Sequence, residues 1–284
     1  MSLLPDGFSF SQASLQDFEV CRRRFYLRYV LGLRWPASPA EPIDEHERRV
    51  RMGTEFHRLA QQHLLGVPVE RLASSSREPE LEEWWQSYLT TDPVAKYSES
   101  DGRATIRTEV SLMAPLAGYR LMARYDVLVV SPGDRAVVLD WKTSDRPPNG
   151  VWLRERLQSR VYPYVLVAAG AHLNAGEPIE PRTVDMVYWY PCFPDQAVRL
   201  PYSSPQHEEN QRYLIDLVTT IAELGEDAFV RSDDERVCLY CSYRSYCDRG
   251  ERAGDLFESP DELDLAADPD DFDLDLEQIA EIEF

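Results

Sequence analysis

The sequence predicts an α/β fold in which a mixed β-sheet is flanked by helices. Three observations support this fold class. Apolar residues recur at helical spacing over roughly the first 90 residues, short apolar runs separated by turn residues follow from about 105 to 142, and helical and strand patterns alternate after about residue 150. The resulting order α-α-α-β-β-β-α-β-β-α is typical of one mixed sheet covered by helices.

Three helices are expected before the first strand. The first begins at about Ser9, where a serine lies near the expected cap, and apolar residues at roughly helical spacing continue it to Val30, before a Trp-Pro break at 35–36. Similar patterns predict a second helix over 44–65 and a third over 79–89.

The centre of the chain is expected to form the sheet. Pro163 lies inside the helix predicted after the third strand, and its missing N–H is expected to kink that helix. Strands separated by turn residues are predicted over 105–113, 119–130, 136–142, 183–190 and 197–200, and helices over 151–169 and 205–224.

The length and composition are those of a globular protein. The chain has 284 residues, of which 43% are hydrophobic and 11% aromatic, enough for one large domain or for a domain with a helical annex. No apolar run approaches the roughly 18 residues of a membrane span, and the first residues lack the basic region of a signal peptide. We therefore expect a soluble cytoplasmic protein with no membrane partner.

The net charge of −20 argues against nucleic-acid binding until its distribution is considered. Residues 251–284 carry fourteen acids and one arginine, or −13, which leaves −7 for residues 1–250. Nine arginines against five acids between positions 20 and 60 predict a local basic stripe. The acidic segment 255–284 is expected to be a disordered, solubilising tail, with a DNA mimic and a partner-binding peptide as the alternatives.

Two carboxylates and an amine form the most informative pattern of the chain. Asp126 closes one short apolar run, and Asp140 and Lys142 close the next run, fourteen and sixteen residues later. Two adjacent strands joined by a turn at 131–134 would bring these side chains to one end of a sheet. Two hard oxygen ligands beside an ammonium group suit Mg²⁺ or Mn²⁺ and the orientation of a water against a phosphodiester.

Four of the five cysteines form a second pattern. Cys238-x2-Cys241-x5-Cys247 supplies three closely spaced thiols, and Cys21 supplies a fourth if the ends of the chain meet. Four thiolates fit a 4Fe–4S cluster or tetrahedral zinc, and four buried reduced cysteines are the remaining alternative. A ligand set of this kind closes a very long loop, so metal binding becomes folding free energy. Cys192, between a proline and a phenylalanine, is expected only to pack.

The acidic pattern resembles the PD-(D/E)XK nuclease superfamily, and Asp140-Trp-Lys-Thr143 is most similar to its RecB-type branch. The cysteines, with the segment Cys21-Arg-Arg-Arg-Phe25, resemble the iron–sulfur version of this superfamily found in AddB-type recombination nucleases and CRISPR-adaptation nucleases. Arg22 stands where that segment often has a proline, and Ala123 where a glycine is usual. The resemblance spans about residues 8–250 and implies a restriction-endonuclease-like mixed-sheet core with a helical iron–sulfur annex.

The resemblance also implies which residues line the site. His57, in a Gly-x-x-x-His segment, corresponds to a histidine that ligates the metal. Glu109 is expected either to line the site or, as the alternative, to face outward from its strand. Gln158-x-x-x-Tyr162 resembles a motif that borders the site and either hydrogen-bonds DNA or supports the lysine.

The roles implied for these groups are those of a hydrolase of phosphodiesters. Asp126 and Asp140, with the backbone carbonyl of Trp141 and with His57, would hold one or two divalent ions. Lys142 would position the attacking water or offset charge on the phosphate. The arginines considered for contact with the DNA backbone are Arg22, Arg23, Arg24, Arg28, Arg154 and Arg160.

These features predict a metal-dependent DNA nuclease with a 4Fe–4S cluster, an exonuclease on single-stranded DNA or DNA ends, in DNA repair, recombination or foreign-DNA processing. The alternatives are a nuclease that trims CRISPR spacer precursors and, in another class, a non-catalytic DNA-binding subunit stabilised by its cluster. Because the sequence has no P-loop, unwinding would need a helicase or another repair or CRISPR-adaptation partner. One nuclease domain is expected over 1–254, with a cluster annex formed by about 8–35 and 226–250.

Overall fold

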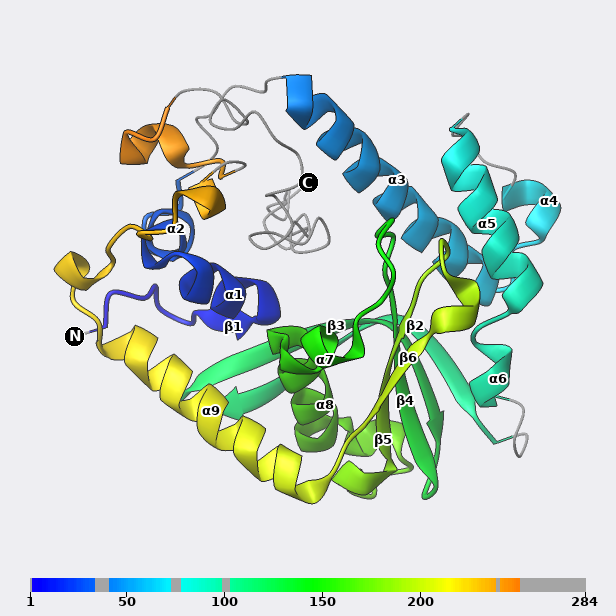
Figure 1. The fold of residues 1–284 in the computed structure, drawn as a ribbon. Helices are drawn as coiled ribbons and strands as arrows, with labels where there is room; N and C mark the ends of the chain where they lie inside the picture. Colours follow the sequence, from blue (N-terminus) through cyan, green and yellow to red (C-terminus); the bar gives the residue numbers. More distant parts are fainter. Residues whose placement is uncertain (1, 34–40, 73–77, 99–102, 239–240, 251–284) are drawn as a thin grey trace, which may run out of the picture. The chain divides into compact units, whose positions relative to one another are not determined.

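A computed structural model of the protein describes residues 2–33, 41–72, 78–98, 103–238 and 241–250, without the side chains of 41–47. The chain forms two compact units, whose elements are drawn in Figure 1. The sheet unit comprises Gly7–Gln12 and Met52–Thr220, and the cysteine unit comprises Met1–Asp6, Ala13–Arg51 and Ile221–Phe284. The predicted acidic tail and the Trp-Pro break lie outside the described residues, and the single domain expected over 1–254 stays a prediction.

The sheet unit is built on a mixed six-stranded sheet with the order β1-β3-β4-β5-β6, in which β2 also pairs with β3. The pairs β1–β3 and β4–β5 are parallel, and β2–β3, β3–β4 and β5–β6 are antiparallel. The predicted mixed sheet is therefore confirmed. The strands are β1 (Ser9–Ser11), β2 (Thr105–Leu116), β3 (Tyr119–Ser131), β4 (Arg135–Trp141), β5 (Val184–Trp189) and β6 (Val198–Pro201).

The helix predicted from Ser9 is wrong for its first three residues, which form β1. The Phe10 side chain of this strand is buried, and its backbone pairs in parallel with β3 more than a hundred residues later. A three-residue strand is too short for a period of two to register in the sequence, and its distant partner fixes its conformation. The first helix runs from Gln12 to Val20 instead, so the helix predicted to continue to Val30 is also interrupted at Cys21.

The other predicted helices are present, with short additions. The cysteine unit also contains a π-helical turn at Tyr26–Val30 and the 3₁₀ turns Glu226–Ala228, Glu235–Cys238 (η6) and Arg244–Cys247 (η7). Three 3₁₀ turns of the sheet unit lie at Gly170–Leu173, Pro181–Thr183 and Pro194–Gln196. The α-helices are α1 (Gln12–Val20), α2 (Arg22–Phe25), α3 (Glu41–Leu64), α4 (Val69–Leu72), α5 (Pro79–Thr91), α6 (Ala95–Ser98), α7 (Gly150–Glu155), α8 (Leu157–Ala169) and α9 (Ser204–Glu223).

One face of the sheet packs against α3 and α5, which lie together in Figure 1. Successive side chains of a strand point to opposite faces, and the odd-numbered residues of β4 enter this core. Phe56 of α3 stacks on Trp189 of β5 with ring centroids 6.3 Å apart, and Trp85 of α5 is 2% exposed. Aromatic rings of this size supply much of the apolar area that holds the helices to the sheet.

The other face is covered by α8, and the even-numbered residues of β4 point toward it. The single helix predicted over 151–169 is interrupted at Arg156, whose backbone is extended with φ of −63° and ψ of 145°. The interruption therefore falls before Pro163, which α8 includes without ending. Asn149 caps α7 by accepting hydrogen bonds from the backbone N–H groups of Val151 and Trp152.

The cysteine unit is held together by aromatic packing between segments that are far apart in the sequence. Phe229 stacks on Phe25 and on Tyr26, with centroid distances of 6.1 and 5.2 Å. Tyr243 adds a 2.8 Å hydrogen bond from its hydroxyl to the carbonyl of Leu33. The first and last described segments of this unit therefore meet. Among the described helices, none has the length and apolar character that a membrane crossing requires.

Candidate active site

The candidate site lies where β3 and β4 separate. β2 follows one edge of β3 along nearly its whole length, while β1 and β4 share the other edge at residues 120–122 and 127–131. The β3–β4 ladder ends at the Val127↔Leu139 pair, which opens a fork beside Asp126. Asp126 Oδ2 spans this fork and accepts a 2.8 Å hydrogen bond from the Trp141 backbone N–H. The bond satisfies an N–H group that the end of the ladder would leave open.

Three metal-binding side chains converge at the fork. One donor atom from each of His57, Glu109 and Asp126 lies within 4.8 Å of the others, and His57 Nδ1 is 3.2 Å from Asp126 Oδ1. Glu109 has a left-handed backbone with φ of 53°, and its carboxylate is 2.7 Å from Arg124 Nε. A positive φ at a non-glycine residue is strained, and such strain is concentrated at functional sites. The outward orientation considered for Glu109 is not the one in the structure.

Asp140 lies on the other arm of the fork between two polar partners. Lys142 Nζ is 3.1 Å from its Oδ2, and Gln158 Nε2 of α8 donates a 2.6 Å hydrogen bond to its Oδ1. All three side chains are buried. Asp140 Oδ2 and Gln158 Oε1 accept no hydrogen bond of regular geometry from the described residues. Buried oxygens with unused lone pairs are uncommon, and both are available to a cation or a water.

A glycine lets α3 approach the fork closely. A Cβ atom at Gly53 would lie 3.0 Å from Thr143 Oγ1, just after β4. Glycine inside a helix costs about 1 kcal/mol relative to alanine, so its presence here is explained by the close approach. His57 follows one turn later on the same helix and reaches Asp126.

The two aspartates have pKa values that are shifted in opposite directions. Burial raises the pKa of Asp126, but His57, the Trp141 N–H and Lys142 together outweigh burial and hold this pKa below its ordinary value. Burial and the charge of Asp126 raise the pKa of Asp140 to about 6, although Lys142 opposes the increase. Burial and Asp126 also raise the pKa of Glu109. A divalent cation would relieve this concentration of negative charge.

The donor set fits Mg²⁺ or Mn²⁺. Carboxylate oxygens are the ligands that both ions prefer, and a single imidazole is compatible with Mn²⁺ in particular. Asp126 and His57 contribute from β3 and α3, and Glu109 from β2, whereas Asp140 on β4 lies outside this group of three and stays a predicted ligand. The Trp141 carbonyl stays a predicted ligand.

Cation binding is expected to stabilise the protein more at pH 7.5 than at about pH 5. In the metal-free protein the raised pKa of Asp140 contributes stability that is complete below the ordinary aspartate pKa of 3.8 and is lost as the pH rises through about 6. The loss is about 3 kcal/mol, and a cation bound to the carboxylate offsets it. Thermal unfolding with and without Mn²⁺ at both pH values measures the difference. An equal or larger Mn²⁺-induced shift at pH 5 would contradict this expectation.

The two residues of the Gln-x-x-x-Tyr pattern have different surroundings. Gln158 contacts Asp140 rather than the lysine it was considered to support. The Tyr162 ring packs 5.2 Å from the ring of Tyr125, and the Tyr125 hydroxyl donates a 3.0 Å hydrogen bond to the Tyr162 carbonyl. These contacts make Tyr162 part of the packing of α8 on the sheet.

Tyr188 is a site residue that the sequence did not reveal. The Lys142 Nζ lies 5.8 Å from the centre of its ring, and its hydroxyl is 2.7 Å from Ser159 Oγ. The ring is fully buried and limits the positions that the lysine can take. Tyr188 could be identified only from the parallel pairing of β4 with β5, in which Asp140 lies beside Tyr188. A single sequence does not give this register.

The predicted DNA-contacting arginines are largely occupied by internal contacts. Arg24 and Arg28 pair with Asp17 at 2.6 and 3.1 Å. Arg160 lies 4.8 Å from the Tyr213 ring and donates a hydrogen bond to Asn210. Arg22 and Arg23 lie over the rings of Phe18 and Tyr26.

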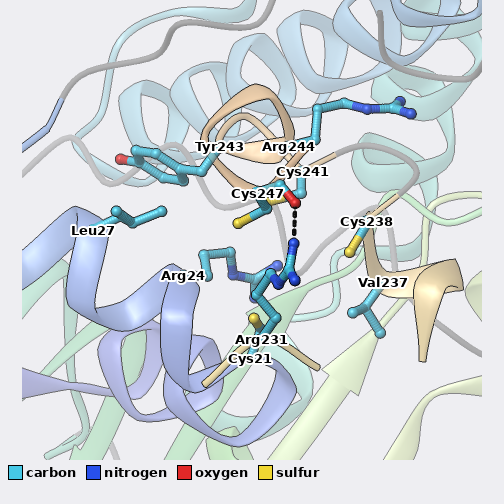
Figure 2. Close-up of a pocket in the computed structure, with 10 residues that line it drawn as sticks. All are labelled: Cys21, Arg24, Leu27, Arg231, Val237, Cys238, Cys241, Tyr243, Arg244 and Cys247. Carbon is cyan, nitrogen blue, oxygen red and sulfur yellow. Dashed lines mark hydrogen bonds between the residues drawn. The ribbon is translucent and has the colours of Figure 1, made fainter. Parts of the chain in front are cut away.

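Four cysteines line one pocket of the cysteine unit (Figure 2). Cys21 precedes α2, Cys238 ends η6, Cys247 ends η7, and Cys241 lies between these two turns in the sequence. Burial raises the pKa of Cys241 to about 11, and also raises the pKa values of Cys238 and Cys247. The charge of Cys21 contributes to all three increases, so the four sulfurs interact electrostatically. Four thiolates are the ligand set of a 4Fe–4S cluster or of tetrahedral zinc, and either occupant stays a prediction.

Arginines surround this pocket. Arg24 faces Cys21 and Cys241. Burial lowers the pKa of Arg24, but the charges of Asp17, Cys241 and Cys21 outweigh burial and raise this pKa. Arg231 donates a hydrogen bond to the Cys247 carbonyl, the dashed line in Figure 2. Guanidinium groups beside thiolates offset the negative charge that a four-thiolate site accumulates.

Known proteins match most of the chain. The model of the PD-(D/E)XK nuclease superfamily matches residues 9–248. Among solved structures, SSO0001 aligns with a TM-score of 0.40 and 13% identity over 86% of both chains. A candidate exonuclease from Eubacterium rectale aligns with a TM-score of 0.49 and 11% identity over 80% of this chain and 85% of that chain. The search of curated proteins gives no match.

The family match contains every residue described at the fork and all four pocket cysteines. The six-stranded mixed sheet flanked by helices is consistent with the restriction-endonuclease-like fold of that family. The chain therefore belongs to the PD-(D/E)XK nuclease superfamily.

Proposed function

We propose that this protein is a metal-dependent deoxyribonuclease that acts as an exonuclease on single-stranded DNA or DNA ends. The observation that carries the proposal is the fork itself. It gathers His57, Glu109 and Asp126 within 4.8 Å, with the Asp140–Lys142 pair on its other arm. Such a set of hard ligands beside one buried ammonium group suits phosphodiester hydrolysis.

Each group of the fork has a distinct role in this proposal. A bound Mg²⁺ or Mn²⁺ would supply charge neutralisation at the scissile phosphate and a water of lowered pKa. Asp126, Asp140 and His57 hold the ion, and Glu109 extends the ligand set. Lys142, restrained by Asp140 and by the Tyr188 ring, orients the attacking water or offsets charge that develops on the phosphate.

Gln158 acts as a positioning residue. Its amide N–H group donates to Asp140 Oδ1, so the carboxylate keeps Oδ2 for Lys142. The carbonyl oxygen of the same amide accepts no hydrogen bond from the described residues. It is therefore available to a water or to a hydroxyl group of the substrate.

A 4Fe–4S cluster held by Cys21, Cys238, Cys241 and Cys247 is the second part of the proposal. Its support is the pocket that these four side chains line, together with the cationic Arg24 beside them. The cluster would join segments more than two hundred residues apart and so stabilise the cysteine unit. Zinc is the alternative occupant, with the same thiolates as ligands.

The biological setting is proposed from the motifs. Asp140-Trp-Lys-Thr143 favours a RecB- or AddB-like role in repair, recombination or foreign-DNA processing over the trimming of CRISPR spacer precursors. A helicase or other repair protein is the expected partner, and the cytoplasm the expected location. A non-catalytic DNA-binding subunit is the alternative of another class.

The test is cleavage of end-labelled DNA by the anaerobically purified full chain. With Mn²⁺, we expect labelled linear single strands or duplex ends to be shortened, and we expect EDTA to stop the reaction. Separate 5′ and 3′ labels give the polarity, and circular single-stranded DNA serves as the matched substrate without ends. Cleavage of the circular DNA would contradict exonuclease action and indicate an endonuclease. Binding of DNA without cleavage in Mn²⁺ or Mg²⁺ would favour the non-catalytic alternative.

A further inference from the structure

An exposed tryptophan lies on α7, the helix that precedes α8 and its site residue Gln158. Trp152 of α7 is 45% exposed, although tryptophan is one of the largest apolar side chains. The Arg156 guanidinium lies over its ring, 4.5 Å from the ring centre. Arg156 itself is only 8% exposed, so the cation is fixed by the fold and supports one face of the ring. The remaining exposed surface of Trp152 is a rigid aromatic platform.

The platform is connected to the catalytic fork through α8. Arg156 is the residue that precedes α8, and Gln158, two residues later, donates to Asp140. Two residues of backbone span at most about 7 Å. Burial and Asp140 raise the pKa of Tyr188, and Lys142 and Arg156 both oppose the increase, so both cations lie near that ring. The Trp152–Arg156 pair is therefore linked to Asp140 through the first residues of α8.

The surface beside α7 suits a nucleic-acid strand. An open groove of about 640 Å³ borders α7 at Val151 and Arg154, whereas Trp152 and Arg156 do not line it. Arg154 in its lining can meet a phosphate. Stacking on an aromatic ring tolerates any base, because every base has a π-face, and Arg adds a cation–π contribution. The groove is lined by Pro147, Pro148, Asn149, Val151, Arg154 and Arg199, among others.

We propose that Trp152 stacks on an unpaired base of the DNA strand whose phosphodiester lies at the fork, and thereby selects single-stranded DNA. A base inside a duplex is already stacked and paired, so only an unpaired base offers its face to the ring without an unstacking cost. This inference rests on the proposed nuclease function and assigns its substrate class. It makes Trp152 a binding residue outside the metal site.

The test compares the kinetics of Trp152→Ala and Trp152→Phe with those of Met113→Ala, a control on β2 at another exposed apolar side chain, which is 52% exposed and does not line the groove. With linear single-stranded DNA and Mn²⁺, Trp152→Ala is expected to raise KM about 5- to 150-fold with little change in kcat, the range for loss of one stacked base. Trp152→Phe retains a ring and is expected to stay near the wild type, as is Met113→Ala.

A scan with abasic nucleotides separates stacking from a structural role. In the wild type, one abasic position near the cleaved bond should raise KM, and in Trp152→Ala the same position should have no further effect. Identical abasic profiles in both proteins, or a wild-type profile with no sensitive position, would overturn the inference. The scan of the wild type can overturn the inference even if Trp152→Ala does not fold, because it requires only the wild-type protein.

The two proposals fail in different ways. If the wild type cleaves single strands but its cleavage ignores missing bases, only the stacking inference is overturned. If the wild type cleaves no DNA with either metal, the nuclease function is overturned, and the stacking inference is overturned with it. Cleavage of duplex ends in strong preference to single strands would overturn the selectivity while leaving the nuclease function in place.

Discussion

Replacing Asp140 with asparagine is expected to lower DNA cleavage about 10³-fold or more. The change removes one of the carboxylate charges at the fork and leaves Lys142 without the partner 3.1 Å from its Nζ. Loss of a group that stabilises transition-state charge has effects of this size. Single-turnover cleavage of a labelled strand in Mn²⁺ measures the rate.

A second measurement distinguishes loss of the metal site from loss of the fold. Asp140→Asn is expected to abolish most of the thermal stabilisation that Mn²⁺ gives to the wild type, because a charged ligand is lost. Asp134→Asn, at an exposed residue in the β3–β4 turn, is the matched control and should keep both cleavage and the Mn²⁺ response. Unchanged cleavage by Asp140→Asn in a folded protein would contradict the assignment of the site.

The regular elements of the fold could be predicted because their signals are local. The change from helical spacing to short apolar runs gives β2, β3 and β4 within a few residues of their observed bounds. The same local reading predicts Asp126 and Asp140 at the ends of neighbouring runs. Asp140 is near the end of β4, whereas Asp126 lies within β3, at the point where its pairing with β4 stops. The antiparallel pairing of β3 with β4 then requires only the short turn that joins them.

The features that the sequence did not give depend on distant partners. β1 is three residues long and is a strand only because β3 lies beside it. The fork depends on where the β3–β4 ladder stops, and the contact between Lys142 and Tyr188 depends on the register of β4 with β5. A one-residue change of register would move Tyr188 to the other face, and a single sequence does not specify that register.

The arginines show that a charge count made from the sequence is limited in the same way, because it does not reveal distant partners. A cluster near residue 22 predicts a basic stripe, yet Arg24 and Arg28 share the carboxylate of Asp17. A charge count does not show this neutralisation, because Asp17 lies in α1 and its partners lie in α2 and in the π-helical turn that follows it. Arg24 is better explained as a structural cation beside the cysteines than as a phosphate contact.

Cys241→Ser is expected to remove the proposed cluster and to destabilise the cysteine unit strongly. Cys241 is 8% exposed and lines the pocket with the other three cysteines, so its loss breaks a complete ligand set. A link between Cys21 and Cys238 closes a loop of more than two hundred residues, and its loop-closure term alone is about 5 kcal/mol. A loss of this size lowers the unfolding temperature by about 10–20 °C. Iron, sulfide and zinc analysis of the anaerobic protein, with its absorbance near about 400 nm and its thermal unfolding, tests the change.

Cys192→Ser supplies the matched control, because Cys192 packs against the core of the sheet unit and does not line the pocket. A serine there should cost only about 1 kcal/mol and leave the metal content unchanged. If Cys241→Ser and Cys192→Ser were equally mild and neither protein contained iron or zinc, the four pocket cysteines would be ordinary buried thiols. If the wild type contains zinc and Cys241→Ser does not, the four cysteines still link distant segments, but through zinc instead of a 4Fe–4S cluster. The stability argument depends on four thiolates sharing one occupant, and the absorbance and metal analysis identify which occupant that is.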